Sequence, residues 1–507
     1  MFTQGEHMRV LLVHPSGLMY SEVYLKLEPL GLERVGAAVR DAGHEVRMID
    51  LQVFSHKELF DEIESFDPQV IAFSLNYLAN IPEVIDLSKE IKSQRPNVFI
   101  FTGGHSISFV AEEVLEHAAG AIDCIIQGEG EVTAPMVIDA IPNVDGLPGV
   151  RTLREVGPKA QMLDDLDRFH PARDLARRRR KYFIGVLDPC ASIEFTRGCP
   201  WDCSFCSAWT FYGRSYRKAS PEAAAEEMAS IKEPNVFIVD DVAFVHPEHG
   251  EAIADEIEKR NIRKQYYLET RCDVLLRNED VFRRWAKLGL EYMFLGFESI
   301  NEDQLKMFRK RVTPNENFAA LELARKLGVR VAINLIADPS WDENDFLRAQ
   351  EWALQVPEVV HLTVATPYPG TELFHTDQRR LSTLDYRLYD VQHAVLPTTL
   401  PLHRFYELLV QTQANINKKA LGWKTFFQLS GLLAKQWARG QFNTTKMLFS
   451  FNKVYNPDRQ YGDHQKPVKY EIRRADHNGR DVKRGQELYV HNTNLTVSAQ
   501  QPEQVTA

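Results

Sequence analysis

Short apolar runs alternate with amphipathic segments over the first 140 residues. The runs are rich in Val and Ile, as in buried parallel strands, and occupy Val10–Val13, Val46–Ile49, Val70–Phe73, Val98–Phe101 and Ile122–Ile126. The clearest helix begins at Pro29 and ends at Gly43, residue types that favour a first turn and a C-terminal cap. The pattern predicts an α/β unit over residues 1–142: a doubly wound, Rossmann-like parallel sheet that binds ligands beyond its carboxyl edge.

A second alternation of strands and helices spans residues 190–400. Its strand candidates are Ser192–Phe195, Val236–Val239, Tyr266–Glu269, Tyr292–Leu295, Arg330–Leu335 and Leu362–Ala365. Six βα units predict a partial (β/α)6 barrel, with its chemistry at the carboxyl ends of the strands. Residues 143–189 are expected to form a linker, in which the basic run Arg177–Lys181 is exposed.

Only helices are predicted after the barrel, over residues 401–457. Within them Leu402–Phe451 interleaves large apolar side chains with Lys and Arg. This pattern is compatible with a helical cap on the barrel and with a surface that lies on a membrane, and the two can coexist. Residues 458–507 are polar and lack periodicity, so we predict a disordered tail there.

Composition narrows the class of protein. The 507 residues are 44% hydrophobic and 26% charged, and the net charge of −10 disfavours nucleic acid as a partner. No apolar run is long enough to span a membrane, and the start MFTQGEHMRV is too polar for a signal peptide, so we expect a cytoplasmic protein. Six cysteines are too few for a disulfide scaffold, which favours metal or redox chemistry for those that cluster.

Three cysteines follow the first strand of the second series. Cys199, Cys203 and Cys206 have CxxxCxxC spacing within the segment EFTRGCPWDCSFCS. Thiolates from one tight loop can bind three irons of a [4Fe–4S] cluster and leave the fourth iron open to a substrate. The alternatives are structural zinc, for which a second pair of ligands is lacking, and a closed cluster with Cys190 as fourth ligand.

This motif and its flanks resemble the radical S-adenosylmethionine (SAM) superfamily. The resemblance continues through five later segments, which are similar to its cobalamin-binding branch: Tyr216–Pro221, Val239–Val242, Glu269–Asp273, Gly296–Ser299 and Thr366–Leu373. It implies a [4Fe–4S] cluster, SAM and cobalamin as cofactors. It also implies reductive cleavage of SAM to a radical that abstracts hydrogen from an unactivated carbon.

The resemblance assigns candidate residues in the barrel to SAM. They are the charged residues at predicted strand ends, Asp240, Asp241, Arg271 and Glu298. A structural ion-pair network around the barrel mouth is the alternative for all of them. Tyr368 lies in the turn Pro367–Gly370 and is a candidate for the wall of the substrate cavity, although the turn alone could account for it.

The resemblance also assigns residues after the N-terminal strands to cobalamin. They are His14, Ser16, Ser74, Gly103, Gly104, Gly128, Glu129 and Gly130. The alternative is a nucleotide-binding or ligand-free flavodoxin-like domain, although GxGxxG is absent. The DxHxxG motif of many cobalamin domains is also absent. The cobalt therefore either takes His14 or His105 as its lower ligand or has no protein nitrogen ligand.

The segment Leu12–Leu51 and the overall layout resemble the hopanoid C-3 methylase family. This implies radical methylation of an unactivated carbon of a lipid, the C-3 position of hopanoids. It also implies an external electron donor such as flavodoxin or ferredoxin, and it fits peripheral contact with the inner face of the cell membrane. The alternatives are a radical cyclase, a methylase of another small molecule, a cofactor sensor and a tRNA-modifying enzyme, of which acidity disfavours the last.

Overall fold

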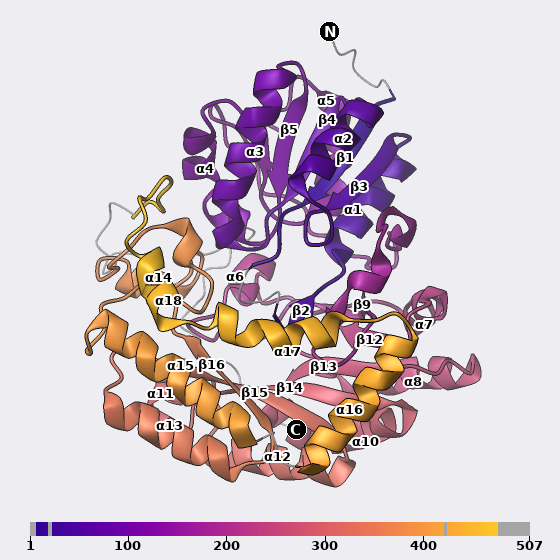
Figure 1. The fold of residues 1–507 in the computed structure, drawn as a ribbon. Coiled ribbons are helices and arrows are strands. Elements are labelled where there is room, and N and C mark those ends of the chain that lie inside the picture. The colour runs from indigo at the N-terminus through magenta and orange to yellow at the C-terminus, as the bar shows by residue number, and fades with distance from the viewer. Residues whose placement is uncertain (1–6, 19–22, 420–422, 475–507) are drawn as a thin grey trace, which may run out of the picture.

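The computed structural model describes residues 7–18, 23–419 and 423–474. Figure 1 shows two α/β units, one above the other, with the C-terminal helices lying across the second. Each unit is built on a six-stranded sheet, which confirms the expected fold class. Within the described ranges, no helix has the length and apolar character needed to cross a membrane.

The first sheet has the strand order β3-β1-β4-β5-β6-β7. Its strands are β1 (Arg9–His14), β3 (Glu45–Asp50), β4 (Val70–Ser74), β5 (Phe99–Gly103), β6 (Cys124–Ile126) and β7 (Val150–Arg151). The first five are parallel, as predicted, and β7 adds a two-residue antiparallel edge. Alternate residues of β1 enter different cores, because Val10 and Leu12 pack on one face and Leu11 and Val13 on the other. Burial on both faces explains the continuous apolar runs.

Five helices cover this sheet. They are α1 (Leu30–Asp41), α2 (His56–Phe66), α3 (Ile81–Gln94), α4 (Ala111–Ala118) and α5 (Gly130–Ala140). Helices α1 and α5 pack against each other, as do α3 and α4. The loops between strands and helices at the carboxyl edge point toward the second unit (Figure 1).

The second sheet is an open, all-parallel barrel with the order β16-β15-β14-β13-β12-β9. Its strands are β9 (Cys190–Ile193), β12 (Asn235–Ile238), β13 (Gln265–Arg271), β14 (Leu290–Glu298), β15 (Arg330–Ala337) and β16 (Val359–Val364). Along β13, Leu268 enters the core under the helices, whereas Tyr267 and Glu269 line the lumen. No ladder joins β9 to β16 among the described strands, so the barrel has a lateral gap.

Helices surround the outer face of this barrel. They are α7 (Pro221–Ser230), α8 (Pro247–Lys259), α9 (Cys272–Arg277), α10 (Glu279–Leu288), α11 (Glu302–Met307), α12 (Pro314–Leu327) and α13 (Glu343–Gln355). Two short helices, α6 (Ala208–Tyr212) and α14 (Glu372–Asp377), instead pack against the first unit. Trp285 of α10 is fully buried against Phe195, Phe244 and Tyr266. Two small ribbons complete the unit: β2 (Leu25–Lys26) pairs with β8 (Phe183–Ile184), and β10 (Thr196–Arg197) pairs with β11 (Arg217–Lys218).

Among the described residues, the barrel is followed by helices α15 (Leu402–Lys418), α16 (Trp423–Ala438), α17 (Asn443–Val454) and α18 (Pro457–Asp463). Helix α15 packs on α13 and β16, as expected for a cap. The expected disorder from residue 458 is wrong for the described part of that segment. Helix α18 packs on α15, and Tyr470 and Ile472 are buried against the first unit. Residues 475–507 of the predicted tail lie outside the described residues.

Candidate active site

The loop after β9 gathers the three clustered cysteines. Burial raises the pKa of Cys199 to about 12, and the charges of Asp241 and Cys203 add to this effect. The pKa of Cys206 is also raised, by burial and by the charges of Cys199 and Cys203. The three sulfurs therefore lie close enough to repel one another as thiolates, and coordination to iron would relieve that repulsion.

Two cations lie beside these sulfurs. The Arg271 guanidinium lies 3.7 Å from Cys203 Sγ and 4.4 Å from the centre of the Trp201 ring. The charge of Cys203 also reaches Lys310, whose ammonium donates to Glu298 at 2.8 Å. The described ranges contain no group of three His, Cys, Asp or Glu side chains spaced for a single metal ion. Convergent thiolates with adjacent cations fit an anionic [4Fe–4S] cluster.

Cys190 does not join this group. It is the first residue of β9, pairs with Asn235, and packs with Leu187 and Phe237 in a small apolar core. The cluster loop leaves the opposite end of the strand, about 10 Å away at the usual rise per residue. Cys190 is therefore a core side chain, and the interpretation with this residue as fourth ligand is wrong.

The two aspartates after β12 have different surroundings. Asp240 accepts hydrogen bonds from Phe195 N, Thr196 N and Thr196 Oγ1 at 2.6–3.0 Å, so it holds the start of the cluster loop. Asp241 accepts from Gly198 N at 2.9 Å and faces a cavity, where desolvation raises its pKa to about 6. Only Asp241 presents its carboxylate toward a ligand-sized space.

Glu269 belongs to the same group of carboxylates, although it is not among the candidates for SAM that the sequence suggested. Its pKa is raised to about 7 by burial and by the charges of Asp241 and Glu298. Glu269 and Glu298 both line the barrel lumen, and Glu298 has a left-handed backbone with φ of 62°. The available signal was its position at a lumen-facing end of a strand.

A cavity of about 490 Å³ lies at the carboxyl edge of the first sheet, between the two units. It is lined by six of the candidates for cobalamin, which are Ser74, Gly103, Gly104, Gly128, Glu129 and Gly130. Gly104 has φ of 126°, and a Cβ there would lie 2.8 Å from Asn76 Oδ1 and from the Leu75 carbonyl oxygen. Because glycines leave the backbone without side chains at this edge of the sheet, a large flat ligand can approach it closely.

The histidine candidates have partners at this cavity. His105 Nε2 lies 2.8 Å from Ser207 Oγ, beside Cys206, and its ring stacks on Phe211 at 4.5 Å. His14 and Ser16 line an adjoining cavity of about 210 Å³. His14 Nδ1 lies 2.9 Å from the Pro15 carbonyl oxygen and 3.4 Å from Asp50. A role for either histidine at cobalt stays a prediction.

Glu129 also borders the larger cavity, but its carboxylate is bound by the protein. It accepts from Arg197, from Arg217 and from Leu163 N at 2.6–3.1 Å. Burial alone would raise its pKa, but the Arg217 and Arg197 guanidinium groups outweigh burial and lower it to about 2. Since Arg197 lies two residues before Cys199, Glu129 ties the first unit to the cluster loop.

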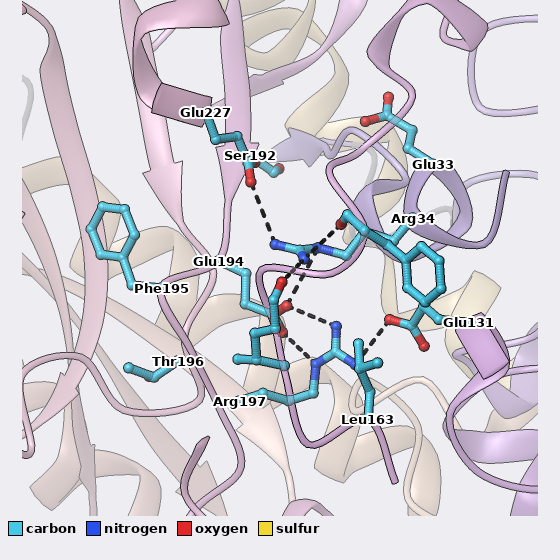
Figure 2. A network of polar contacts seen from close by, with 12 residues as sticks. Glu33, Arg34, Glu131, Leu163, Ser192, Glu194, Phe195, Thr196, Arg197 and Glu227 are labelled. Carbon is cyan, nitrogen blue, oxygen red and sulfur yellow. Dashed lines mark hydrogen bonds and ion pairs between the residues drawn. The ribbon is translucent and has the colours of Figure 1, made fainter. Parts of the chain in front are cut away.

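Figure 2 shows the buried network between the units to which Arg197 also belongs. Arg197 pairs with Glu131 of α5 and with Glu194, and Arg34 of α1 pairs with Glu194 and Glu227. The basic run Arg177–Lys181 of the linker contributes further ion pairs near this network. Arg179 pairs with Glu28 and Glu233, so the expectation of an exposed run is wrong for this residue.

The barrel lumen holds the largest of these cavities, about 640 Å³, with a predominantly apolar lining. Phe205, Phe308 and Ala365 line it near the cluster loop, and Tyr24, Met447 and Tyr455 line it at the lateral gap. Tyr368 lies in its wall, and its contact with a substrate stays a prediction. Burial lowers the pKa of His361 to about 4, which keeps this lumen side chain neutral at pH 7.

The comparisons with known proteins agree with a division of the chain into a first unit and a barrel unit. Residues 18–138 match the model of the B12 binding domain, and residues 193–353 match the model of the radical SAM superfamily. The chain is 56% identical to the hopanoid C-3 methylase of Methylococcus capsulatus over 91% of this chain and 90% of that protein. It is 28% identical to the anaerobic magnesium-protoporphyrin IX monomethyl ester cyclase of Synechocystis over 83% and 88%, respectively.

Solved structures share the fold. The radical SAM methyltransferase TsrM of Kitasatospora setae, with cobalamin and a [4Fe–4S] cluster bound, superimposes with a TM-score of 0.60 at 17% identity, over 75% of this chain and 76% of that one. The cobalamin-dependent SAM radical enzyme OxsB gives a TM-score of 0.59 at 19% identity over 70% and 53%. With both family models and the Methylococcus relative in agreement, this chain belongs to the cobalamin-binding radical SAM family, in the group of the hopanoid C-3 methylase.

Proposed function

We propose that the chain transfers a methyl group to the C-3 carbon of hopanoids. The single observation that carries this proposal is the lumen cavity, which is large, apolar and lined by residues beside the cysteine loop. A volume of about 640 Å³ lies within the range of roughly 300–1,000 Å³ typical of small-molecule sites. The Methylococcus relative carries the name of this activity.

When bound, the cluster and SAM would supply the radical that removes a substrate hydrogen, and cobalamin would supply the methyl group. Cys199, Cys203 and Cys206 would hold the cluster. Arg271 and Lys310 compensate charge beside these sulfurs, and Glu298 and Asp241 present carboxylates suited to the amino or hydroxyl groups of SAM.

The wall of the lumen would orient the substrate and exclude water. Tyr267, Tyr292 and Phe294 provide flat apolar surfaces along β13 and β14, and neutral His361 adds no charge. Water exclusion matters because a carbon radical must persist until the methyl group arrives. An external flavodoxin or ferredoxin would supply electrons, and a membrane-resident substrate would bring the protein to the inner face of the cell membrane.

Anaerobic turnover with methyl-deuterated SAM, cobalamin, a reductant and a hopanoid tests this function directly. We expect a labelled methyl group on the hopanoid, together with S-adenosylhomocysteine and 5′-deoxyadenosine. An unlabelled, ring-closed product would instead match the reaction class of the cyclase relatives and would overturn the proposal.

A substitution in the lumen sharpens the test. Ala332→Trp places a large ring in the lumen cavity, so methylation should fall at least about 100-fold while the iron content stays the same. The control Leu347→Trp places the same side chain on the exposed face of α13, away from the cavity. Equal methylation by the two variants would show that the substrate does not occupy the lumen.

A further inference from the structure

Helix α17 has one face turned toward the lumen. Thr444 is fully buried, Met447 lines the cavity, and Val454 is buried against Val23. These positions are separated by three and seven residues, which places them on one side of a helix. The helix runs across the front of the barrel sheet (Figure 1), from Asp188, next to the edge strand β9, to the α15–α18 side.

The opposite side of α17 presents large apolar side chains to solvent. Phe449 is 78% exposed, the highest value among the large hydrophobic side chains of the described residues, and Phe442 is 51% exposed. Trp437 of α16 is 51% exposed and donates from Nε1 to Thr445 Oγ1 at 2.7 Å, so it lies beside α17. Adjacent aromatic residues of this exposure mark an interaction surface.

The charge of this region is opposite to that of the whole chain. Residues 408–457 contain seven lysines and arginines and no aspartate or glutamate, whereas the protein has a net charge of −10. Lys435, Arg439 and Lys446 are exposed near the aromatic side chains. Aromatic residues interleaved with lysine and arginine are typical of helices that lie in the interface of an anionic bilayer.

The same helices are bonded to a segment that lines the lumen cavity beside the lateral gap, the mouth of the cavity. Asn443 donates to Asp188 through its backbone N and its Nδ2 at 3.1 and 2.9 Å, and Gln436 Nε2 donates to the Val186 carbonyl oxygen at 3.0 Å. Gly185, Val186 and Leu187 themselves line the lumen cavity. The aromatic surface and the mouth of the cavity therefore belong to one connected piece of structure.

We propose that helices α16 and α17 dock on an anionic phospholipid bilayer and thereby bring the mouth of the lumen to the membrane. We assign a bilayer to this surface because exposed aromatic rings occur there together with lysines and arginines, and residues 408–457 contain no acidic side chain. That the bilayer also delivers the substrate rests on the proposed function. The docking itself depends only on Phe442, Phe449 and the basic residues.

Vesicle flotation of the reconstituted full chain tests the docking. The vesicles contain phosphatidylcholine with or without phosphatidylglycerol. We expect binding to the anionic vesicles that weakens at high salt. F442S/F449S should reduce the partition coefficient at least about ten-fold, because two phenyl rings no longer enter the bilayer. The matched control L347S/L354S changes two half-exposed leucines of α13 and should bind as the wild type does.

A double charge reversal tests the electrostatic contribution to vesicle binding. K435E/K446E should abolish the preference for anionic vesicles, whereas K287E/K326E, with exposed lysines on α10 and α12, should retain it. Wild-type binding by F442S/F449S would overturn the proposal. So would a wild-type chain that ignores vesicles but forms a dimer that F442S/F449S abolishes, since the surface would then bind a second copy.

Activity separates this proposal from the function on which it rests. The ratio of methylation of vesicle-embedded hopanoid to methylation of detergent-dispersed hopanoid should fall in F442S/F449S. If the wild type methylates hopanoid in neither form, the proposed function fails, and vesicle flotation still decides the docking. A ratio equal to that of the wild type would overturn the delivery of substrate from the bilayer.

Discussion

Replacing Glu129 with Gln keeps the shape of a side chain that ties the two units together and removes its charge. Glu129 is 5% exposed and binds Arg197 and Arg217. Its pKa of about 2, against an ordinary 4.5, corresponds to about 3 kcal/mol of favourable interaction at neutral pH. Breaking a buried ion pair typically costs about 3–5 kcal/mol, which agrees with that figure.

Thermal unfolding of the holoprotein measures this loss. Glu129→Gln should lower the midpoint by an amount on the order of 5 °C at pH 7. The pKa is lowered in the folded state, so the stabilisation is complete above about pH 4.5 and is lost as the pH falls toward 2. At pH 4 the difference between variant and wild type should therefore shrink by about 0.8 kcal/mol.

A double-mutant cycle assigns the loss to the ion pair. Arg217→Gln should cost much less in the Glu129→Gln background than in the wild type, because the two residues share one contact. Asp61→Asn breaks an exposed pair with Lys57 on α2 and should leave the midpoint nearly unchanged. A midpoint for Glu129→Gln within about 1 °C of the wild type would refute the reasoning.

Three further substitutions test the cofactor sites. Cys203→Ser should prevent assembly of the cluster, seen as a near-complete loss of bound iron after reconstitution; retained iron would contradict its role as ligand. Glu298→Gln should weaken SAM binding about ten-fold in equilibrium dialysis with iron content unchanged, and an unaltered affinity would count against the assignment. Gly104→Ala should reduce cobalamin retention on gel filtration because a Cβ would meet backbone oxygen at 2.8 Å, and full retention would show that the edge is not a binding surface.

Sequence patterns were sufficient to predict those features of the structure that lie within one strand or one loop. The run Val10–Val13 reads as a buried strand because both of its faces are covered, and the three cysteines are seven residues apart at most. Because each feature lies within one short segment, the sequence carries the whole pattern. The cysteine loop and the positions of the main strands along the chain could therefore be predicted.

Features that depend on distant segments could not be predicted. Glu129 meets Arg217 across 88 residues, and Glu113 accepts from the backbone N of Arg473 across 360 residues. Arg179 reads as exposed because its acidic partners, Glu28 and Glu233, lie far away in the sequence. Charge alone favours solvent, and only the tertiary structure shows that a buried charge is paired.

The route of a lipid into the lumen follows from what already covers the barrel. The first unit lies over the carboxyl ends of the strands, where His105 reaches Ser207 and Phe109 packs against Gly370. Leu25 lines both the lumen and the cavity beside His14, so the two spaces adjoin inside the protein. A substrate that must meet both cannot enter between the units without separating the Glu129 contacts. At the lateral gap between β9 and β16 the lumen is lined by Tyr24, Met447 and Tyr455, and Met447 belongs to α17, the helix whose outer face carries the exposed Phe449.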